Sequence, residues 1–152
     1  MKLIIQMLAM FLFVTPVLAE DANSDAQLTK EAVMANKKLL ISTNMGLSEE
    51  EKKTFWPVYD EYQEMLGKLN QRTIALIKEY AESFDSITDA KAGELLDEFL
   101  SIEEDTLALK QKFIPKFEKI LSKRKVVRYY QIEEKVKSII NFDLVNKIPL
   151  VH

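Results

Sequence analysis

Leu47-Ser48-Glu49-Glu50-Glu51 is the most complete helix start in this chain of 152 residues. The Ser48 hydroxyl can accept a hydrogen bond from an N–H group of the first turn, which has no partner inside the helix. Glu51 stands three residues later, where its carboxylate can accept a bond from the Ser48 N–H and complete a capping box. The five residues therefore predict that a helix begins immediately after Ser48.

Three further starts also pair an aliphatic residue with a hydroxyl residue: Leu28-Thr29, Ile87-Thr88 and Leu121-Ser122. The aliphatic residue can pack on the fourth helical residue, which is Val33 after the first pair and Val126 after the last. Gly46 can end the first helix in a left-handed conformation. Four starts predict four helices, at about 30–45, 49–84, 89–120 and 123–145.

Side chains recur at steps of three and four residues through the two long segments, which is the helical period. In the third segment they are Leu95, Phe99, Ile102, Thr106, Leu109, Phe113, Phe117 and Ile120. The linker at 85–87 is short, so the two long helices should be antiparallel neighbours. Pro57 and Pro115 each remove a backbone donor, which predicts kinks at the same end. The expected fold is all-α, a curved hairpin of two long kinked helices flanked by two shorter ones.

Residues 1–19 predict a cleaved signal peptide, because a basic residue precedes an apolar run that ends in small residues. A retained anchor is the alternative, but Gln6 and Pro16 leave fewer uninterrupted apolar residues than the roughly 20 that span a bilayer. We expect cleavage after Ala19, a flexible lead-in at 20–27 and one all-helical domain at 28–152. With no cysteine for lipid attachment, the mature protein should be free in the periplasm.

The composition limits the function classes. Twenty-one basic residues oppose 24 acidic ones, a net charge of −3, which makes nucleic acid a poor partner. The lone histidine is the terminal His152 and there is no cysteine, so the usual nucleophile pairs, general bases and zinc ligands are missing. We expect no enzymatic activity, no cofactor and no metal site, with a site made of carboxylates alone as the alternative that the composition leaves open.

Basic residues are concentrated where the third and fourth predicted helices meet. Within thirteen residues, with only Glu118 opposing them, lie Lys116, Lys119, Lys123, Arg124, Lys125 and Arg128. Such asymmetry suggests a surface for an acidic partner, a second copy of the chain or anionic lipid. The alternative is a favourable interaction with the negative end of the third helix, although cations in the first turn of the fourth helix oppose its positive end. The basic run is therefore equally compatible with a partner-binding surface and with charge interactions at the helix ends.

A second candidate patch is aromatic and consists of Phe55, Trp56, Tyr59, Tyr62, Tyr129 and Tyr130. Rings at helical spacing are more often core than binding surface. Consecutive residues, however, diverge by about 100° around a helix, so the rings of an adjacent pair cannot both face one core. We expect one ring from 55/56 and one from 129/130 to be available to a partner.

The end of the chain is a third candidate surface. Pro149 stops any helix, and the segment from Ile148 to Val151 is apolar. We expect this tail to pack on its own bundle, with insertion into a partner as the alternative.

Two of the helix starts carry a family resemblance. Leu47-Ser48-Glu49-Glu50-Glu51 and Leu121-Ser122-Lys123-Arg124-Lys125 resemble degenerate copies of the L-T-x-x-Q motif of Spy/CpxP-like periplasmic proteins, and neither keeps the glutamine. The resemblance implies a bent all-helical cradle that pairs as an antiparallel homodimer and is made in response to envelope stress. It also implies the motif and capping residues Leu47, Ser48, Glu51, Leu121, Ser122 and Lys125.

Three functional hypotheses follow. The resemblance implies an ATP-independent chaperone that binds unfolded envelope proteins, and this is the favoured one. The second is an accessory or inhibitory partner that docks its basic segment on the periplasmic domain of a stress-sensing kinase. Its role would then be in signalling or in metal-stress sensing. The third is a protein that binds an anionic membrane surface through the same basic segment.

Overall fold

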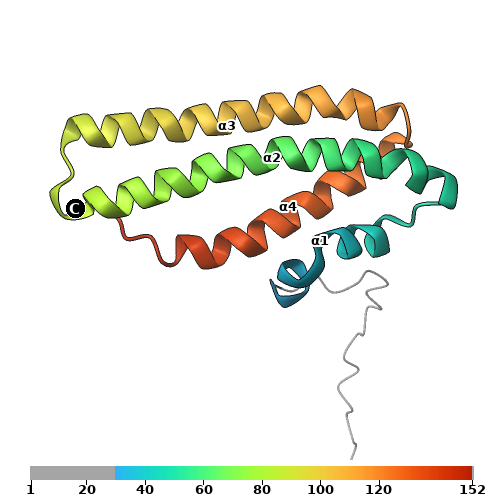
Figure 1. The fold of residues 1–152 in the computed structure, drawn as a ribbon, viewed down its shortest axis with the longest axis horizontal. Coiled ribbons are helices and arrows are strands. Elements are labelled where there is room, and N and C mark those ends of the chain that lie inside the picture. The colour runs from blue at the N-terminus through green and yellow to red at the C-terminus, as the bar shows by residue number, and fades with distance from the viewer. Residues whose placement is uncertain (1–29, 152) are drawn as a thin grey trace, which may run out of the picture.

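The structure is a computed structural model that describes residues 30–151. Its elements are α1 (Lys30–Met45), α2 (Glu49–Ser83), the short 3-10 turn η1 (Phe84–Ser86), α3 (Asp89–Glu118) and α4 (Lys123–Val145) (Figure 1). The predicted all-α fold is confirmed over these residues. Four expectations lie outside the described residues: the signal peptide, the lead-in, the Leu28-Thr29 cap and the position of His152. So does the packing of the Val33 side chain.

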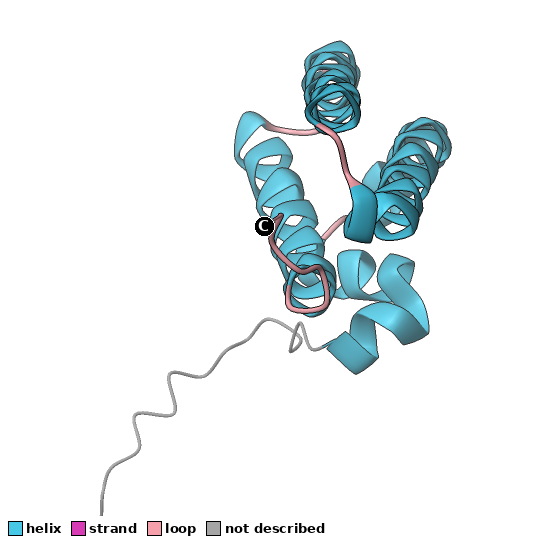
Figure 2. Cartoon of the chain, turned by 90° about the vertical axis from the view of Figure 1, so that its left-hand side faces the viewer, coloured by secondary structure: helices cyan, strands magenta, loops and turns pink. Residues whose placement is uncertain are grey.

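Two long helices form the body of the molecule. α2 and α3 run antiparallel and side by side, while α4 crosses beneath them and α1 packs against α4 near the start of α2 (Figure 1). Viewed along the long axis, α4 lies beside the α2–α3 pair and outside its plane (Figure 2). The predicted hairpin with two shorter flanking helices is therefore the observed arrangement.

Hydroxyl caps begin three of the helices, as predicted. Ser48 Oγ accepts a hydrogen bond from the Glu51 N–H at 3.2 Å, and the Ser48 N–H donates to Glu51 Oε2 at 2.8 Å, which completes the capping box. Thr88 caps α3 and Ser122 caps α4 with bonds of 3.2 and 3.4 Å. Gly46 has a φ of 55°, the left-handed conformation that ends α1 at low cost because glycine has no Cβ.

Replacing Ser48 by alanine should lower the free energy of unfolding by about 1 kcal/mol, because the first turn of α2 loses its cap. Urea unfolding followed by circular dichroism measures this loss. The matched control is Ser138→Ala on the exposed side of α4, where no cap is lost and the change should stay within about 0.5 kcal/mol. Equal effects of the two substitutions would show that the cap contributes nothing.

Pro57 and Pro115 lie inside α2 and α3, and both helices continue past them. The two prolines are at the same end of the hairpin, where the Phe55 and Phe117 rings are 5.7 Å apart. Both helices arch along their length (Figure 1). A third interruption was not predicted: Asn36 has an extended backbone within α1, at φ −165° and ψ 85°. Asn36 Oδ1 accepts a bond from the Leu39 N–H at 2.9 Å, so the side chain restarts the helix.

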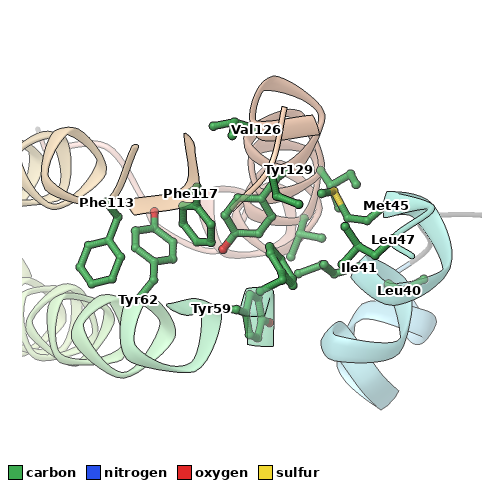
Figure 3. Packing of buried hydrophobic residues seen from close by; sticks show 14 of the residues in the cluster. Leu40, Ile41, Met45, Leu47, Tyr59, Tyr62, Phe113, Phe117, Val126 and Tyr129 are labelled. Atoms are coloured by element: carbon green, nitrogen blue, oxygen red, sulfur yellow. The ribbon is translucent and has the colours of Figure 1, made fainter. Parts of the chain in front are cut away.

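The core lies where the four helices meet, and aromatic rings are its largest buried side chains. Figure 3 shows Tyr62, Phe113, Phe117 and Tyr129 pointing toward one another, with aliphatic side chains of α1 and α4 beside them. The Phe117 and Tyr129 ring centroids are 4.7 Å apart. Aromatic pairs at such separations add roughly 0.5–1.5 kcal/mol each to the gain from burial. Ring packing therefore fixes how α4 sits on the hairpin.

Candidate functional site

The basic segment divides into two halves. Lys116 Nζ pairs with Glu61 at 2.7 Å, Lys125 Nζ with Glu51 at 2.5 Å, and Arg128 Nε donates to the Asn44 carbonyl at 2.5 Å. These three cations hold α3 and α4 against α2 and α1. Lys116 and Arg128 are partner-binding candidates from the sequence, and both are engaged within the chain.

Lys119, Lys123 and Arg124 form the exposed half of the segment. Among the described side chains of residues 30–151, the charged groups of these three residues have no hydrogen-bond or ion-pair partner. Lys123 and Arg124 also stand in the first turn of α4, which contains no acidic residue, so the helix dipole disfavours them. Only three of the six basic residues of the segment are therefore available as a charged surface.

The two motif copies meet in space. Leu47 and Leu121 are buried in the same core, and each precedes the serine that caps its helix. Lys125, the last residue of one copy, donates to Glu51, the last residue of the other. The hydrogen bond from Lys125, followed by the one from the Ser48 backbone, holds the pKa of the Glu51 carboxyl below its usual value. Both copies therefore serve to join helices.

Burial corrects the aromatic patch. Phe55 and Tyr129 are fully buried, with ring centroids 5.4 Å apart, so they are the core ring of each adjacent pair, and Trp56 and Tyr130 stay as the partner-binding candidates. Trp56 and Tyr130 are half-buried. Lys38 Nζ lies 4.9 Å from the Trp56 ring, and the Tyr130 hydroxyl donates to the Lys110 carbonyl at 3.4 Å. Adjacent rings do diverge, but the outer ring of each pair is already partly covered.

A partly buried polar network, which was not predicted from the sequence, joins three helices. Lys37 Nζ lies 2.8 Å from Glu133 Oε2 and donates to Gln63 Oε1 at 2.9 Å. Gln63 Nε2 donates to Glu133 Oε1 at 3.1 Å and to the Tyr129 hydroxyl oxygen at 3.3 Å. Burial, and then the negative charge of Glu133, raises the pKa of the Tyr129 hydroxyl above its ordinary value. The network sets the position of α1 on α2 and α4.

One face of α3 exposes four large apolar side chains, Leu96, Phe99, Leu100 and Leu107, here called the α3 stripe. They are between 50% and 57% exposed. Phe99 was predicted to be core, and the structure corrects this because Leu95 and Ile102 occupy the buried face instead. The spacing of Leu96, Leu100 and Leu107 is itself helical, so a second apolar period was visible in the sequence.

A groove runs beside the α3 stripe. Its volume is about 390 Å³, and it is lined by Leu100, Glu103, Glu104, Thr106, Leu107, Lys110 and Lys137. The first six of these residues come from α3 and the last from α4, so the groove separates these two helices. Leu100 and Leu107 belong to both the groove and the α3 stripe, so the two surfaces are continuous.

Arg72 holds the far half of the hairpin closed. Its guanidinium donates to Glu98 at 2.9 and 3.1 Å, to Asp105 at 2.5 Å and to the Ser101 hydroxyl at 3.0 Å. The bond from Arg72 holds the pKa of the Glu98 carboxyl below its usual value. Two carboxylates of α3 are thereby neutralised on the side that meets α2.

The C-terminal tail contacts its own bundle through its backbone. The Tyr80 hydroxyl donates to the Pro149 carbonyl at 2.8 Å, and Ile148 is half-buried. Leu150 and Val151 point outward, at 87% and 53% exposure. The expected packing on the bundle is thus observed for only part of the tail.

Neither a membrane span nor a metal cluster is found in the described part of the chain. No helix within residues 30–151 is both long and apolar enough to cross a membrane. Over the same residues, no group of three or more His, Asp or Glu side chains could hold a metal ion. In comparisons with known proteins, no family model, curated protein or solved structure matches the chain. The resemblance to Spy/CpxP-like proteins therefore stays a prediction.

Proposed function

We propose that this protein is an ATP-independent, chaperone-like protein of the periplasm that binds unfolded or misfolded envelope proteins. The observation that supports this proposal best is the α3 stripe. Its four large side chains lie within twelve residues of one helix and are each at least half exposed. A contiguous exposed apolar patch costs solubility and commonly marks an interaction site. Unfolded polypeptides offer the matching surface, since their apolar side chains are exposed.

The stripe is suited to reversible capture. Covering a large apolar side chain contributes roughly 1.5–3 kcal/mol, and the half that is still exposed accounts for about half of this. Four such residues could therefore supply a few kcal/mol before the entropy cost of association, which corresponds to weak binding. Weak, non-directional binding lets a client be held and released without nucleotide.

The alternative function is that of an accessory or inhibitory partner of a stress-sensing kinase. The observation that favours it is the exposed trio Lys119, Lys123 and Arg124, whose charges have no partner within residues 30–151. An acidic sensor surface would compensate them. In this case the protein should not suppress aggregation in general, and charge reversal of the trio should abolish capture of the sensor domain.

Light scattering of a diluted denatured client in the presence of residues 20–152 tests the favoured proposal. For the variant Phe99→Ser/Leu100→Ser, the protein concentration that halves aggregation should rise roughly tenfold. The variant loses two apolar contacts of about 1 kcal/mol each, and the remaining stripe residues recover part of this loss. The matched control is Leu39→Ser/Ile74→Ser, which removes two side chains of similar exposure, 61% and 53%, from other helices.

Circular dichroism should show that both double variants keep the helical fold, and a mass measurement should give the proposed homodimer. Suppression that depends on Phe99 and Leu100 supports the proposal. Absence of suppression by the unsubstituted protein, or equal loss in both double variants, contradicts it.

A further inference from the structure

Carboxylates flank the α3 stripe along its length. Asp97 is three residues before Leu100, while Glu103 and Glu104 are each three or four residues from Leu107. Residues three or four apart are neighbours on a helix surface, so each carboxylate lies beside a stripe residue. All three are exposed. A partner that covers the stripe would therefore meet negative charge at its margins.

The other carboxylates in this part of α3 are compensated within the chain. Glu94 pairs with Lys91 at 3.2 Å, and Arg72 binds both Glu98 and Asp105. At the stripe, Asp97 and Glu104 have no ion-pair partner among residues 30–151, whereas Glu103 forms a long ion pair with Lys137 at 3.9 Å.

The one cation of α3 that lines the groove is also compensated. Lys110 lies in the groove beside the stripe, but its ammonium group pairs with Glu134 of α4. The second cation of the groove, Lys137 of α4, lies 3.9 Å from Glu103. The charges beside the stripe that lack an ion-pair partner among residues 30–151 are therefore the negative ones of Asp97 and Glu104, although the opposite end of the molecule exposes Lys119, Lys123 and Arg124.

We propose that the α3 stripe selects cationic amphipathic segments, in which apolar residues at helical spacing are flanked by lysine or arginine. This inference rests on the proposed function and names the class of client. An amphipathic helix can lay its apolar face along the stripe and into the adjoining groove. Its flanking cations would then pair with Asp97, Glu103 and Glu104. An acidic segment would instead bring like charges together, which lowers affinity and slows association.

Three peptides of about 18 residues, roughly five helical turns, test the preference. They share the same apolar face and carry lysine, glutamine or glutamate at the flanking positions. Fluorescence anisotropy with residues 20–152 should give about tenfold tighter binding of the lysine peptide than of the glutamate peptide at about 0.05 M salt, from a few exposed pairs. The ratio should shrink at about 0.5 M salt, because ions screen exposed charges.

Neutral substitutions locate the preference on the protein. Asp97→Asn/Glu104→Gln should weaken binding of the lysine peptide about fivefold and leave the glutamine peptide unchanged. The matched control is Glu82→Gln on α2, an exposed carboxylate without an ion-pair partner in the described chain, which should have no effect. Equal affinities for all three peptides, or equal effects of Glu82→Gln, would overturn the inference.

Failure of this inference and failure of the proposed function give different results. If the glutamine peptide binds and clients are kept from aggregating, but charge makes no difference, only the preference for cationic segments is wrong. If no peptide binds and aggregation is not suppressed, the preference for cationic segments and the proposed function are both wrong. If Phe99→Ser/Leu100→Ser converts a dimer to a monomer while no peptide binds, a second copy occupies the stripe, which contradicts the inference.

Discussion

Replacing Phe117 by alanine should destabilise the protein by about 3–5 kcal/mol, a large part of the roughly 5–15 kcal/mol that stabilises a typical domain. Phe117 is fully buried, and its ring lies 4.7 Å from that of Tyr129 and 5.7 Å from that of Phe55. Removing it leaves a cavity where α3, α4 and α2 meet. Neighbouring rings are rigid and cannot collapse into this space. Urea unfolding followed by circular dichroism should show a much lower midpoint.

The control for this prediction is Phe142→Ala. Phe142 is 71% exposed near the end of α4, so the same change of side chain should alter stability by less than about 0.5 kcal/mol. If Phe142→Ala and Phe117→Ala were to shift the midpoint equally, the assignment of the aromatic core would be wrong.

Replacing Glu133 by leucine is expected to cost about 2–3 kcal/mol. Glu133 is 6% exposed, and the substitution removes the carboxylate that accepts from Lys37 and Gln63. The Lys37 ammonium then keeps only the neutral Gln63 amide oxygen as acceptor in a partly buried site. An amine that loses its partner carries the cost of desolvation, although Lys37, whose side chain is 27% exposed, can recover some hydration. The free energy of unfolding, measured in urea, reports the loss.

A second variant separates a broken pair from a removed pair. In Lys37→Met/Glu133→Leu both charges are gone, and apolar side chains of similar length replace them. This double variant should be more stable than Glu133→Leu alone, because no buried charge is left uncompensated. The second single variant is Lys37→Met. If the double variant is less stable than both Glu133→Leu and Lys37→Met, the network contributes more to stability than the mutual compensation of its two charges.

Helix boundaries could be predicted from the sequence because capping is a local interaction. Ser48, Thr88 and Ser122 each satisfy an N–H three residues away, so the residues that form the signal are adjacent in the chain. The antiparallel hairpin followed from its short linker. By contrast, the Asn36 break was not predicted, since asparagine within a helix does not by itself specify an extended backbone.

The candidate surfaces could be predicted only in part, because exposure depends on tertiary contacts. Lys116 and Lys119 are three residues apart in one basic run, yet Lys116 pairs with Glu61 from a distant part of the chain while Lys119 is exposed. Phe99 fits the core period of α3, but a second period through Leu96 competes with it. Which period is buried depends on where α2 and α4 pack.

Site-specific photocrosslinking reports which face of the protein touches a client. A photoreactive phenylalanine analogue is placed at position 99 or at position 74 in residues 20–152, and each protein is irradiated with a denatured client. If clients bind the α3 stripe, we expect client adducts at position 99, in the stripe, and few at position 74, on α2. Equal adducts at both positions, or none at position 99 while aggregation is suppressed, would contradict this expectation.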